Sequence, residues 1–250
     1  MRALVVEHLA EEGTGAFAEW LPAAGLDLAV HQVERDGPPP AIVDGYDALL
    51  VMGGSMGVPD AGTTHPGLHD DMALLRDAVA RNIPVLGVCL GAQLLAAACG
   101  GAVIRGRVGP ELGVRRVHLA PAAAADPLLG GLPPVVEAVQ WHWDEVLALP
   151  PGATLLAGSP AYPHQAFRVG ERAWGVQFHP EARPSMVERW ARNDAAEVRA
   201  AGEDAAAHVA DVAAAWPELR RTWRIVADRF AKVVHDAAGM ASNAVAGPLS

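Results

Sequence analysis

The segment "GVCLG" (87–91) places Cys89 between two glycines, in the G-x-C-x-G pattern of a nucleophile elbow. In such a turn a strand passes directly into a helix, and small flanking residues let the backbone bend tightly. The first turn of that helix favours a thiolate, because its free N–H groups and its dipole attract negative charge. Free cysteine is also among the residues most often buried in a core. The pattern alone therefore leaves a nucleophile and a core residue equally open for Cys89.

A cysteine nucleophile needs a base, and the base needs an orienting group. The segment "GVQFHPE" (175–181) offers both, since His179 ends an apolar strand-like run and Glu181 follows two residues later. Residues two apart in an extended chain point the same way, and Pro180 fixes the backbone between them. A single histidine is more often structural than catalytic. Its carboxylate partner and its strand-end position make this combination much more specific than either residue alone.

A pair of glycines, Gly53 and Gly54, lies in "MGGSMGV" (52–58), where another apolar strand-like run ends. Glycine lets the backbone approach a ligand closely, and the Gly54 N–H could form an oxyanion hole with the Leu90 N–H. Glycines after strands usually only make turns. This pair precedes the elbow strand by one helical segment, which favours neighbouring positions in one sheet.

Strand-like and helical segments alternate through the first hundred residues. Apolar strand-like runs occupy 2–8, 26–34, 46–54 and 83–91, and helical patterns occupy 13–25, 67–82 and 92–101. This alternation predicts a flavodoxin-like open α/β sheet, mostly parallel, with helices on both faces. Such sheets bind ligands at the carboxyl ends of their strands, which is where both the glycine pair and Cys89 fall.

The second half of the chain has a different pattern. Short strand-like segments separated by turns, from 102 to 181, predict antiparallel additions to the sheet. In "WHWD" (141–144) we expect the two tryptophans on one face and His142 and Asp144 on the other, rather than an aromatic rim to the site. We expect one α/β domain over 1–190 and a helical extension over 191–250.

That extension carries one amphipathic pattern and one weakly patterned end. The apolar residues from Leu219 to Val233 recur at helical spacing, which favours a face that docks onto the domain over a helix that binds a partner. The final segment, 237–250, is expected to be a loose tail.

The composition excludes several classes of protein. The 250 residues carry a net charge of −10 and no basic cluster, which argues against a nucleic-acid surface. No uninterrupted apolar run reaches the length of about 18 residues that a membrane span needs, and the N-terminus is too short and too acidic for a signal peptide. Two cysteines, Cys89 and Cys99, are too few for a disulfide framework. We therefore expect a cytoplasmic protein, with Cys99 as a packing residue of its helix.

Two polar clusters favour structural explanations. His65 and His69 stand near acidic residues, but no third ligand is evident, so an exposed helix start is favoured and no metal site is expected. Arg105 and Arg107 are more readily explained by salt bridges with acidic neighbours than by contact with a substrate carboxylate.

Together, the motifs resemble the class I glutamine amidotransferases. "PVLGVCLGAQLLA" (84–96), the earlier glycine pair and "GVQFHPE" (175–181) are similar to three signatures of that family, in the same order. The resemblance covers about residues 1–190, the expected glutamine amidotransferase domain. The chain is most similar to the free-standing branch that resembles the glutaminase domain of GMP synthase.

The resemblance implies roles for particular residues. It implies a triad, an oxyanion hole from two backbone N–H groups, and a set of substrate contacts. Gln93 matches a position near bound glutamine, "GPELG" (109–113) resembles the segment beside the substrate, and "WHWDEVLALPPGA" (141–153) resembles a stretch of GMP synthase whose aspartate holds the α-amino group. No metal or organic cofactor is implied. The implied residues are Cys89, His179 and Glu181 for the triad, Gly54 and Leu90 for the oxyanion hole, and Gln93, Gly53, Glu111 and Asp144 for the substrate.

The implied activity is hydrolysis of the γ-amide of glutamine, or of a related γ-glutamyl compound, through a γ-glutamyl thioester. Nothing after residue 190 has the length or the phosphate loop for ATP chemistry. Either a separate synthetase chain receives the ammonia, or the protein acts alone as a γ-glutamyl peptidase or transferase. A catalytically silent regulatory subunit is the third alternative, and the intact motifs weigh against it. The substrate, the ammonia acceptor and the oligomeric state stay open.

Overall fold

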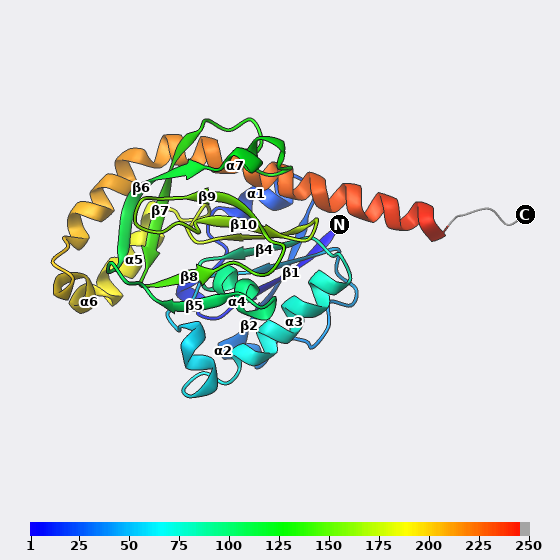
Figure 1. Ribbon diagram of the computed structural model, residues 1–250, viewed down its shortest axis with the longest axis horizontal. Coiled ribbons are helices and arrows are strands. Elements are labelled where there is room, and N and C mark those ends of the chain that lie inside the picture. Colours follow the sequence, from blue (N-terminus) through cyan, green and yellow to red (C-terminus); the bar gives the residue numbers. More distant parts are fainter. Residues whose placement is uncertain (246–250) are drawn as a thin grey trace, which may run out of the picture.

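A nine-stranded sheet organises the protein, with strand order β2-β1-β3-β4-β11-β10-β9-β6-β7 (Figure 1). The computed structural model describes residues 1–245. Strands β5 and β8 form a separate two-stranded sheet. The strands are β1 (Arg2–Glu7), β2 (Asp27–Gln32), β3 (Ala48–Val51), β4 (Val85–Val88), β5 (Ala102–Arg105), β6 (Glu111–Leu119), β7 (Val135–His142), β8 (Asp144–Ala148), β9 (Thr154–Gly158), β10 (Ala166–Val169) and β11 (Ala173–Val176).

The helices are concentrated at the two ends of the chain. Among the described residues, we find no helix with both the length and the apolar character to cross a membrane. The α-helices are α1 (Phe17–Ala23), α2 (Val33–Asp36), α3 (Leu68–Ala80), α4 (Leu90–Ala98), α5 (Pro184–Asn193), α6 (Ala195–Ala200) and α7 (Ala205–Val245), and the 3-10 helices are η1 (Ala10–Glu12), η2 (Val58–Gly62) and η3 (Pro121–Ala125).

The first part of the sheet is parallel, and the second part is antiparallel. Strands β2, β1, β3, β4 and β11 pair in parallel, with Gly87 of β4 opposite Val51 on one side and Gly175 on the other. Strands β10, β9, β6 and β7 continue the sheet in antiparallel pairs. The predicted mostly parallel sheet with antiparallel additions is therefore confirmed. Because parallel strands end at one edge, the segments after β3, β4 and β11 meet there.

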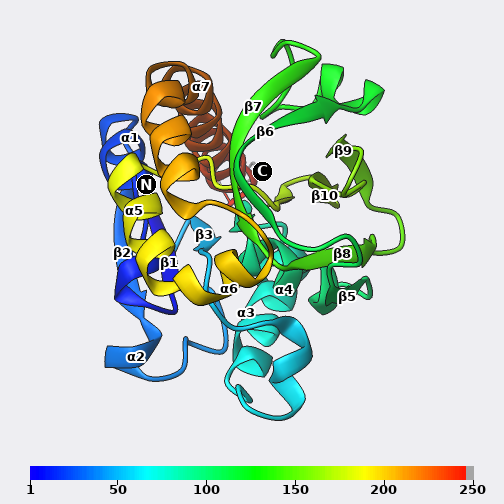
Figure 2. The ribbon, with the colours of Figure 1, turned by 90° about the vertical axis from the view of Figure 1, so that its left-hand side faces the viewer.

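Helices cover both faces of the parallel strands, as Figure 2 shows. Helices α1 and α7 bury their apolar side chains in one core cluster, which includes Trp20 and Trp223. Helices α3 and α4 bury theirs in a second cluster on the other face, which includes Leu75 and Leu94. Strands β3 and β4 are buried along their whole length for this reason.

The last helix, α7, lies along the outside of the molecule and extends beyond the sheet (Figure 1). The predicted docking face is confirmed, because Leu219, Trp223, Val226 and Phe230 are all buried against the core. The loose tail expected from residue 237 is wrong for the described residues, because α7 continues to Val245. The segment is rich in alanine, the strongest helix former, which outweighs a single glycine. Residues 246–250 lie outside the described residues.

The turn between β4 and α4 depends on two glycines. A Cβ added at Gly91 would lie 1.9 Å from the carbonyl oxygen of Val51, and one added at Gly87 would lie 2.5 Å from the carbonyl oxygen of Gly91. Both obstacles are backbone atoms, which have little freedom to move. Glycine is therefore required at both positions for α4 to start so close to the sheet.

We expect Gly91→Ala to lower the free energy of unfolding by at least about 3 kcal/mol, the upper end of the cost of overpacking, because the new methyl group meets rigid backbone. The measurement is urea denaturation followed by circular dichroism. Gly239→Ala in α7 is the matched control, since a Cβ there meets no atom within 4 Å. The control should gain up to about 1 kcal/mol from helix propensity. Equal stabilities for the two variants would contradict this account of the turn.

Candidate active site

Cys89 occupies a strained position at the start of α4. Its backbone has φ 51° and ψ −105°, and it is the N-cap residue of the helix. A non-glycine residue with positive φ costs about 1–3 kcal/mol and persists only where the surrounding structure enforces it. The side chain is nearly buried but lines a pocket. The expected sharp strand-to-helix turn is thus present, and it directs the thiol toward the carboxyl edge of the sheet.

His179 and Glu181 lie beside this thiol, just after β11. The Nδ1 atom of His179 is 2.9 Å from Oε1 of Glu181. The backbone N–H of His179 donates to the carbonyl oxygen of Val139 at 2.8 Å, which ties this segment to β7. Phe178, between two polar neighbours, is buried in the core. The chain turns at Pro180 and Glu181 instead of staying extended as expected, and the turn still brings the imidazole and the carboxylate together.

The environment of His179 favours its protonated form. Burial alone lowers the pKa of the imidazole, but the negative charges of Glu181 and Cys89, together with hydrogen bonds to both, raise it well above its usual value. The indole of Trp190 covers the imidazole, with ring centroids 4.7 Å apart. An aromatic face next to a cation adds further attraction. The site therefore favours an imidazolium at His179, next to the Glu181 carboxylate.

The predicted glycine pair lies directly against this centre. A Cβ added at Gly53 would be 3.2 Å from Cε1 of His179 and 3.8 Å from Cβ of Cys89. A Cβ added at Gly54 would be 2.7 Å from Cδ2 of Leu90. The structure therefore brings together the turn after β3 and the first residue of α4. The N–H of Leu90 belongs to the first helical turn, whose N–H groups have no acceptor within the helix.

A pocket of about 580 Å³ opens in front of the thiol, within the range usual for small-molecule sites. Three tryptophans contribute to its wall, and five carboxylates face it against a single arginine. The side chains that line the pocket therefore carry an excess of negative charge. The lining residues are Glu12, Gly54, Ser55, Met56, Gly57, Pro59, Asp60, Cys89, Gln93, Arg105, Trp141, His142, Trp143, Asp144, His179, Trp190, Asp194 and Glu197.

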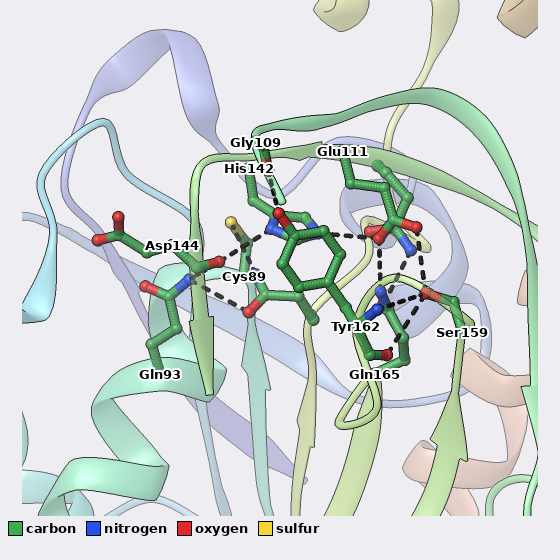
Figure 3. A network of polar contacts seen from close by, with 11 residues as sticks. Cys89, Gln93, Gly109, Glu111, His142, Asp144, Ser159, Tyr162 and Gln165 are labelled. Carbon is green, nitrogen blue, oxygen red and sulfur yellow. Dashed lines mark hydrogen bonds and ion pairs between the residues drawn. The ribbon is translucent and has the colours of Figure 1, made fainter. Parts of the chain in front are cut away.

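A chain of side-chain amides connects the Cys89 thiol to the backbone carbonyl of Asp144 (Figure 3). Nε2 of Gln177 donates to Sγ of Cys89 at 3.7 Å, and Oε1 of Gln177 accepts from Nε2 of Gln93 at 3.2 Å. The Gln93 amide also reaches the carbonyl oxygen of Asp144 at 3.3 Å. Sequence reasoning did not single out Gln177. The signal that could have found it is the same alternation, since it stands two residues before His179.

Glu111 does not reach the pocket, in contrast to the expected substrate contact. It is buried behind His142, whose Nε2 lies 3.2 Å from Oε2 of Glu111 (Figure 3). The same carboxylate accepts hydrogen bonds from Gln165 at 2.6 Å and from Ser159 at 3.2 Å. The other ring nitrogen of His142 is 2.9 Å from the carbonyl oxygen of Asp144. The place of Glu111 in β6, directly opposite His142 in β7, explains this support role.

Asp144 does line the pocket. Burial raises the pKa of its carboxyl group, although Arg105 lowers it through an ion pair of 3.4 Å. The expected alternation of residues 141–144 is wrong, because β7 ends at His142 and β8 begins at Asp144. The chain turns at Trp143, so that both tryptophans line the pocket together with His142 and Asp144.

Metal ligation finds no support in the part of the chain that the structure describes, where no group of three or more His, Cys, Asp or Glu side chains could hold an ion. His65 and His69 are exposed near the start of α3. Asp71, in the first turn of α3, is by contrast buried and lies 3.2 Å from the imidazole of His8.

Comparisons with known proteins show which proteins the chain resembles. The chain is 29% identical to the glutamine amidotransferase-like protein YfeJ of Salmonella typhimurium, over 75% of this chain and 79% of that protein. It is 32% identical to the glutamine-hydrolysing GMP synthase of Aeropyrum pernix over 70% of this chain, but spans only 30% of that synthase. It is 34% identical to gamma-glutamyl peptidase 4 of Arabidopsis thaliana, over 48% of this chain and 51% of that protein.

Solved structures and a family model also match the chain. The glutamine amidotransferase from Methylobacillus flagellatus superposes with a TM-score of 0.81 at 30% identity, covering 92% of this chain and 94% of that one. The family model of the class I glutamine amidotransferases matches residues 16–196, which is more than half of the chain. The protein therefore belongs to the class I glutamine amidotransferase family, and its relatives include a glutamine-hydrolysing GMP synthase and a gamma-glutamyl peptidase.

Proposed function

We propose that this enzyme hydrolyses the γ-amide of glutamine, or of a related γ-glutamyl compound, with Cys89 as the nucleophile. The observation that supports this most strongly is a thiol on a strained turn beside a buried imidazole, which lies 2.9 Å from the Glu181 carboxylate and whose pKa is raised. Such a pair is the arrangement that activates a cysteine for acyl transfer.

In the proposed first step, the Cys89 thiolate forms an S–C bond to the γ-carbonyl carbon, and the π electrons move onto the oxygen. The backbone N–H groups of Gly54 and Leu90 stabilise that oxyanion. The carbonyl then reforms as the C–N bond breaks. His179 gives its proton to the departing nitrogen, which leaves as ammonia or an amine.

The second step releases the acyl group from the γ-glutamyl thioester. Neutral His179 takes a proton from water, whose oxygen attacks the thioester carbonyl and expels the Cys89 thiolate. Glu181 keeps the imidazole oriented through Nδ1 and stabilises its cationic form in both steps. The products are glutamate and a regenerated thiolate–imidazolium pair.

The glutamyl end of the substrate fits the wall around Asp144. Its carboxylate is placed to accept the α-amino group, and Arg105 is the one arginine of the lining that could meet the α-carboxylate. Gln93, tied to Asp144 and Gln177, completes this end. Gly53 acts by keeping the space beside the thiol open. In this scheme Glu111 holds His142 rather than the substrate.

The fate of the nitrogen distinguishes two versions of this function. The similarity to a GMP synthase supports transfer of ammonia to a separate synthetase, although the chain spans less than a third of that protein. The similarity to a gamma-glutamyl peptidase supports a self-sufficient enzyme. The size of the pocket favours the second version, since glutamine would fill only part of it. A silent regulatory subunit would have no need of a strained nucleophile.

Purified protein should release glutamate from glutamine, from γ-glutamyl peptides, or from both, and Cys89→Ala should abolish this release because no other group attacks the carbonyl. Glutamate and ammonia are assayed separately over the panel. Cys99→Ala is the matched control, because burial raises the pKa of that thiol and it lies at the far end of α4. Release that survives in Cys89→Ala would contradict the proposed nucleophile.

The pH profile should report the charge of His179. Because its pKa is raised, kcat/KM should hold well above pH 6.5 and fall only as the imidazolium loses its proton. Glu181→Gln removes the charge that raises this pKa, whereas burial continues to lower it. The alkaline fall should therefore move to lower pH. An unchanged alkaline limb would show that Glu181 does not set the ionisation of His179. The control is Glu188→Gln, an exposed change on α5, which should leave the pH profile as it is.

Asp144→Asn should raise KM about tenfold or more with a smaller change in kcat, since a hydrogen bond between charged groups is worth about 1.5–3 kcal/mol. Initial rates over a range of glutamyl substrate concentrations give both constants. Asp70→Asn, an exposed change on α3, serves as the control. A variant with unchanged KM would remove Asp144 from the glutamyl subsite.

A further inference from the structure

The leaving group must lie on the same side of the thiol as His179, because His179 delivers the proton to the departing nitrogen. On this side the pocket continues along Trp190, whose ring lies 4.7 Å from the imidazole. Trp141 follows, with its ring 6.2 Å from that of Trp190. The direction in which the leaving group extends is therefore defined by two tryptophans.

Two carboxylates continue this wall beyond the tryptophans. Oδ2 of Asp194 accepts a hydrogen bond of 2.7 Å from Nε1 of Trp141, and Glu197 follows one helical turn later. Asp194 is half-buried and Glu197 is exposed, and both line the pocket. We call Trp141, Trp190, Asp194 and Glu197 the leaving-group wall.

The glutamyl end of the pocket does not use this wall. The α-amino and α-carboxylate groups of a γ-glutamyl substrate find opposite charges in Asp144 and Arg105, which pair with each other at 3.4 Å. Gln93 closes this end through its contact with the Asp144 backbone. The leaving-group wall is therefore available for whatever is attached to the γ-nitrogen.

The charge of the wall is unbalanced. Among the described residues, no salt bridge to arginine, lysine or histidine engages Asp194 or Glu197. Burial raises the pKa of Asp194, and the negative charge of Glu197 raises it further. Two carboxylates that repel each other beside aromatic faces form a favourable environment for an ammonium group, which both the charges and the π systems attract.

We propose that the preferred substrates are γ-glutamyl amides of diamines or polyamines, whose distal ammonium group binds at the leaving-group wall. This inference rests on the proposed function and deepens it. Cys89 attacks the γ-carbonyl, the C–N bond breaks, and His179 protonates the nitrogen, so that glutamate and a free diamine are the products. Glutamine lacks the distal ammonium and gains nothing from the wall.

Three amides that share a five-carbon chain test the preference: mono-γ-glutamyl-1,5-diaminopentane, γ-glutamyl-pentylamine and γ-glutamyl-5-aminopentanoate. Their distal groups are cationic, neutral and anionic. We expect kcat/KM to be roughly tenfold higher for the cationic amide than for the neutral one, as one partly exposed ion pair and one cation–π contact would supply. The anionic amide should be the slowest. Equal rates, or a faster anionic amide, would overturn the proposal.

A double variant and a control test whether the leaving-group wall causes the preference for the cationic amide. The Asp194→Asn/Glu197→Gln double variant should reduce the cationic-to-neutral ratio to near one, while the side-chain amide introduced at position 194 can still accept the hydrogen bond from Trp141. The neutral amide serves as the internal reference within each protein. Glu188→Gln removes an exposed carboxylate of α5 that lies outside the pocket, and it should keep the ratio of the unmodified enzyme. A double variant with the original ratio would place the cation elsewhere.

Binding to the Cys89→Ala protein separates this inference from the proposed hydrolysis. Calorimetric titration should give a dissociation constant for the cationic amide roughly tenfold below that of the neutral amide. A binding preference without turnover of any amide by the intact enzyme would contradict the proposed hydrolysis and support the wall. Turnover without any preference, in rate or in binding, would contradict the wall alone.

Discussion

The backbone turn at Cys89 is the constraint on which the rest of the site depends. A non-glycine residue is held at positive φ only because α4 starts within contact of β3 and β4, where Gly91 touches the Val51 carbonyl. The buried parallel strands fix that distance, and helices on both faces fix the strands. The same turn places the thiol, the Leu90 N–H and the glycines after β3 within one small volume. The large core thus supports the conformation of a single residue.

A second layer of interactions sets the charges around this turn. Glu181 and the thiolate keep His179 cationic despite its burial, and Trp190 shields the ring from water. The Gln177 amide bridges the thiol to Gln93, which links the nucleophile to the backbone carbonyl of Asp144. His142, supported by Glu111, contacts the same carbonyl oxygen. Most of these contacts join segments that are distant in sequence, so the geometry is a product of the tertiary fold.

The sequence predicted the features that depend on neighbouring residues. It missed those that depend on contacts between segments distant in the chain. The elbow at Cys89 and the pairing of His179 with Glu181 follow from the spacing of a few residues, and the parallel sheet follows from alternating patterns. The turn at Trp143 interrupts an alternation that looked continuous, which brought both tryptophans into the pocket. Trp190 and Asp194 belong to a region that looks like ordinary amphipathic helix, and only folding shows which faces meet the site. Glu111 lies in β6, in the region where strands were expected. Its carboxylate contacts His142 of β7 and does not line the pocket.

The segment from α5 to α6 connects the pocket to the last helix of the chain. It carries Trp190, Asp194 and Glu197 on the pocket, and it leads into α7, whose buried face is anchored on the opposite side of the sheet from α3 and α4. The nucleophile and the residues that face the outer pocket are consequently encoded in separate stretches. Substitutions at Asp194 and Glu197 can therefore change the outer pocket without touching the reacting centre, whereas Trp190 contacts both. Such modularity would allow one scaffold to serve many different amides.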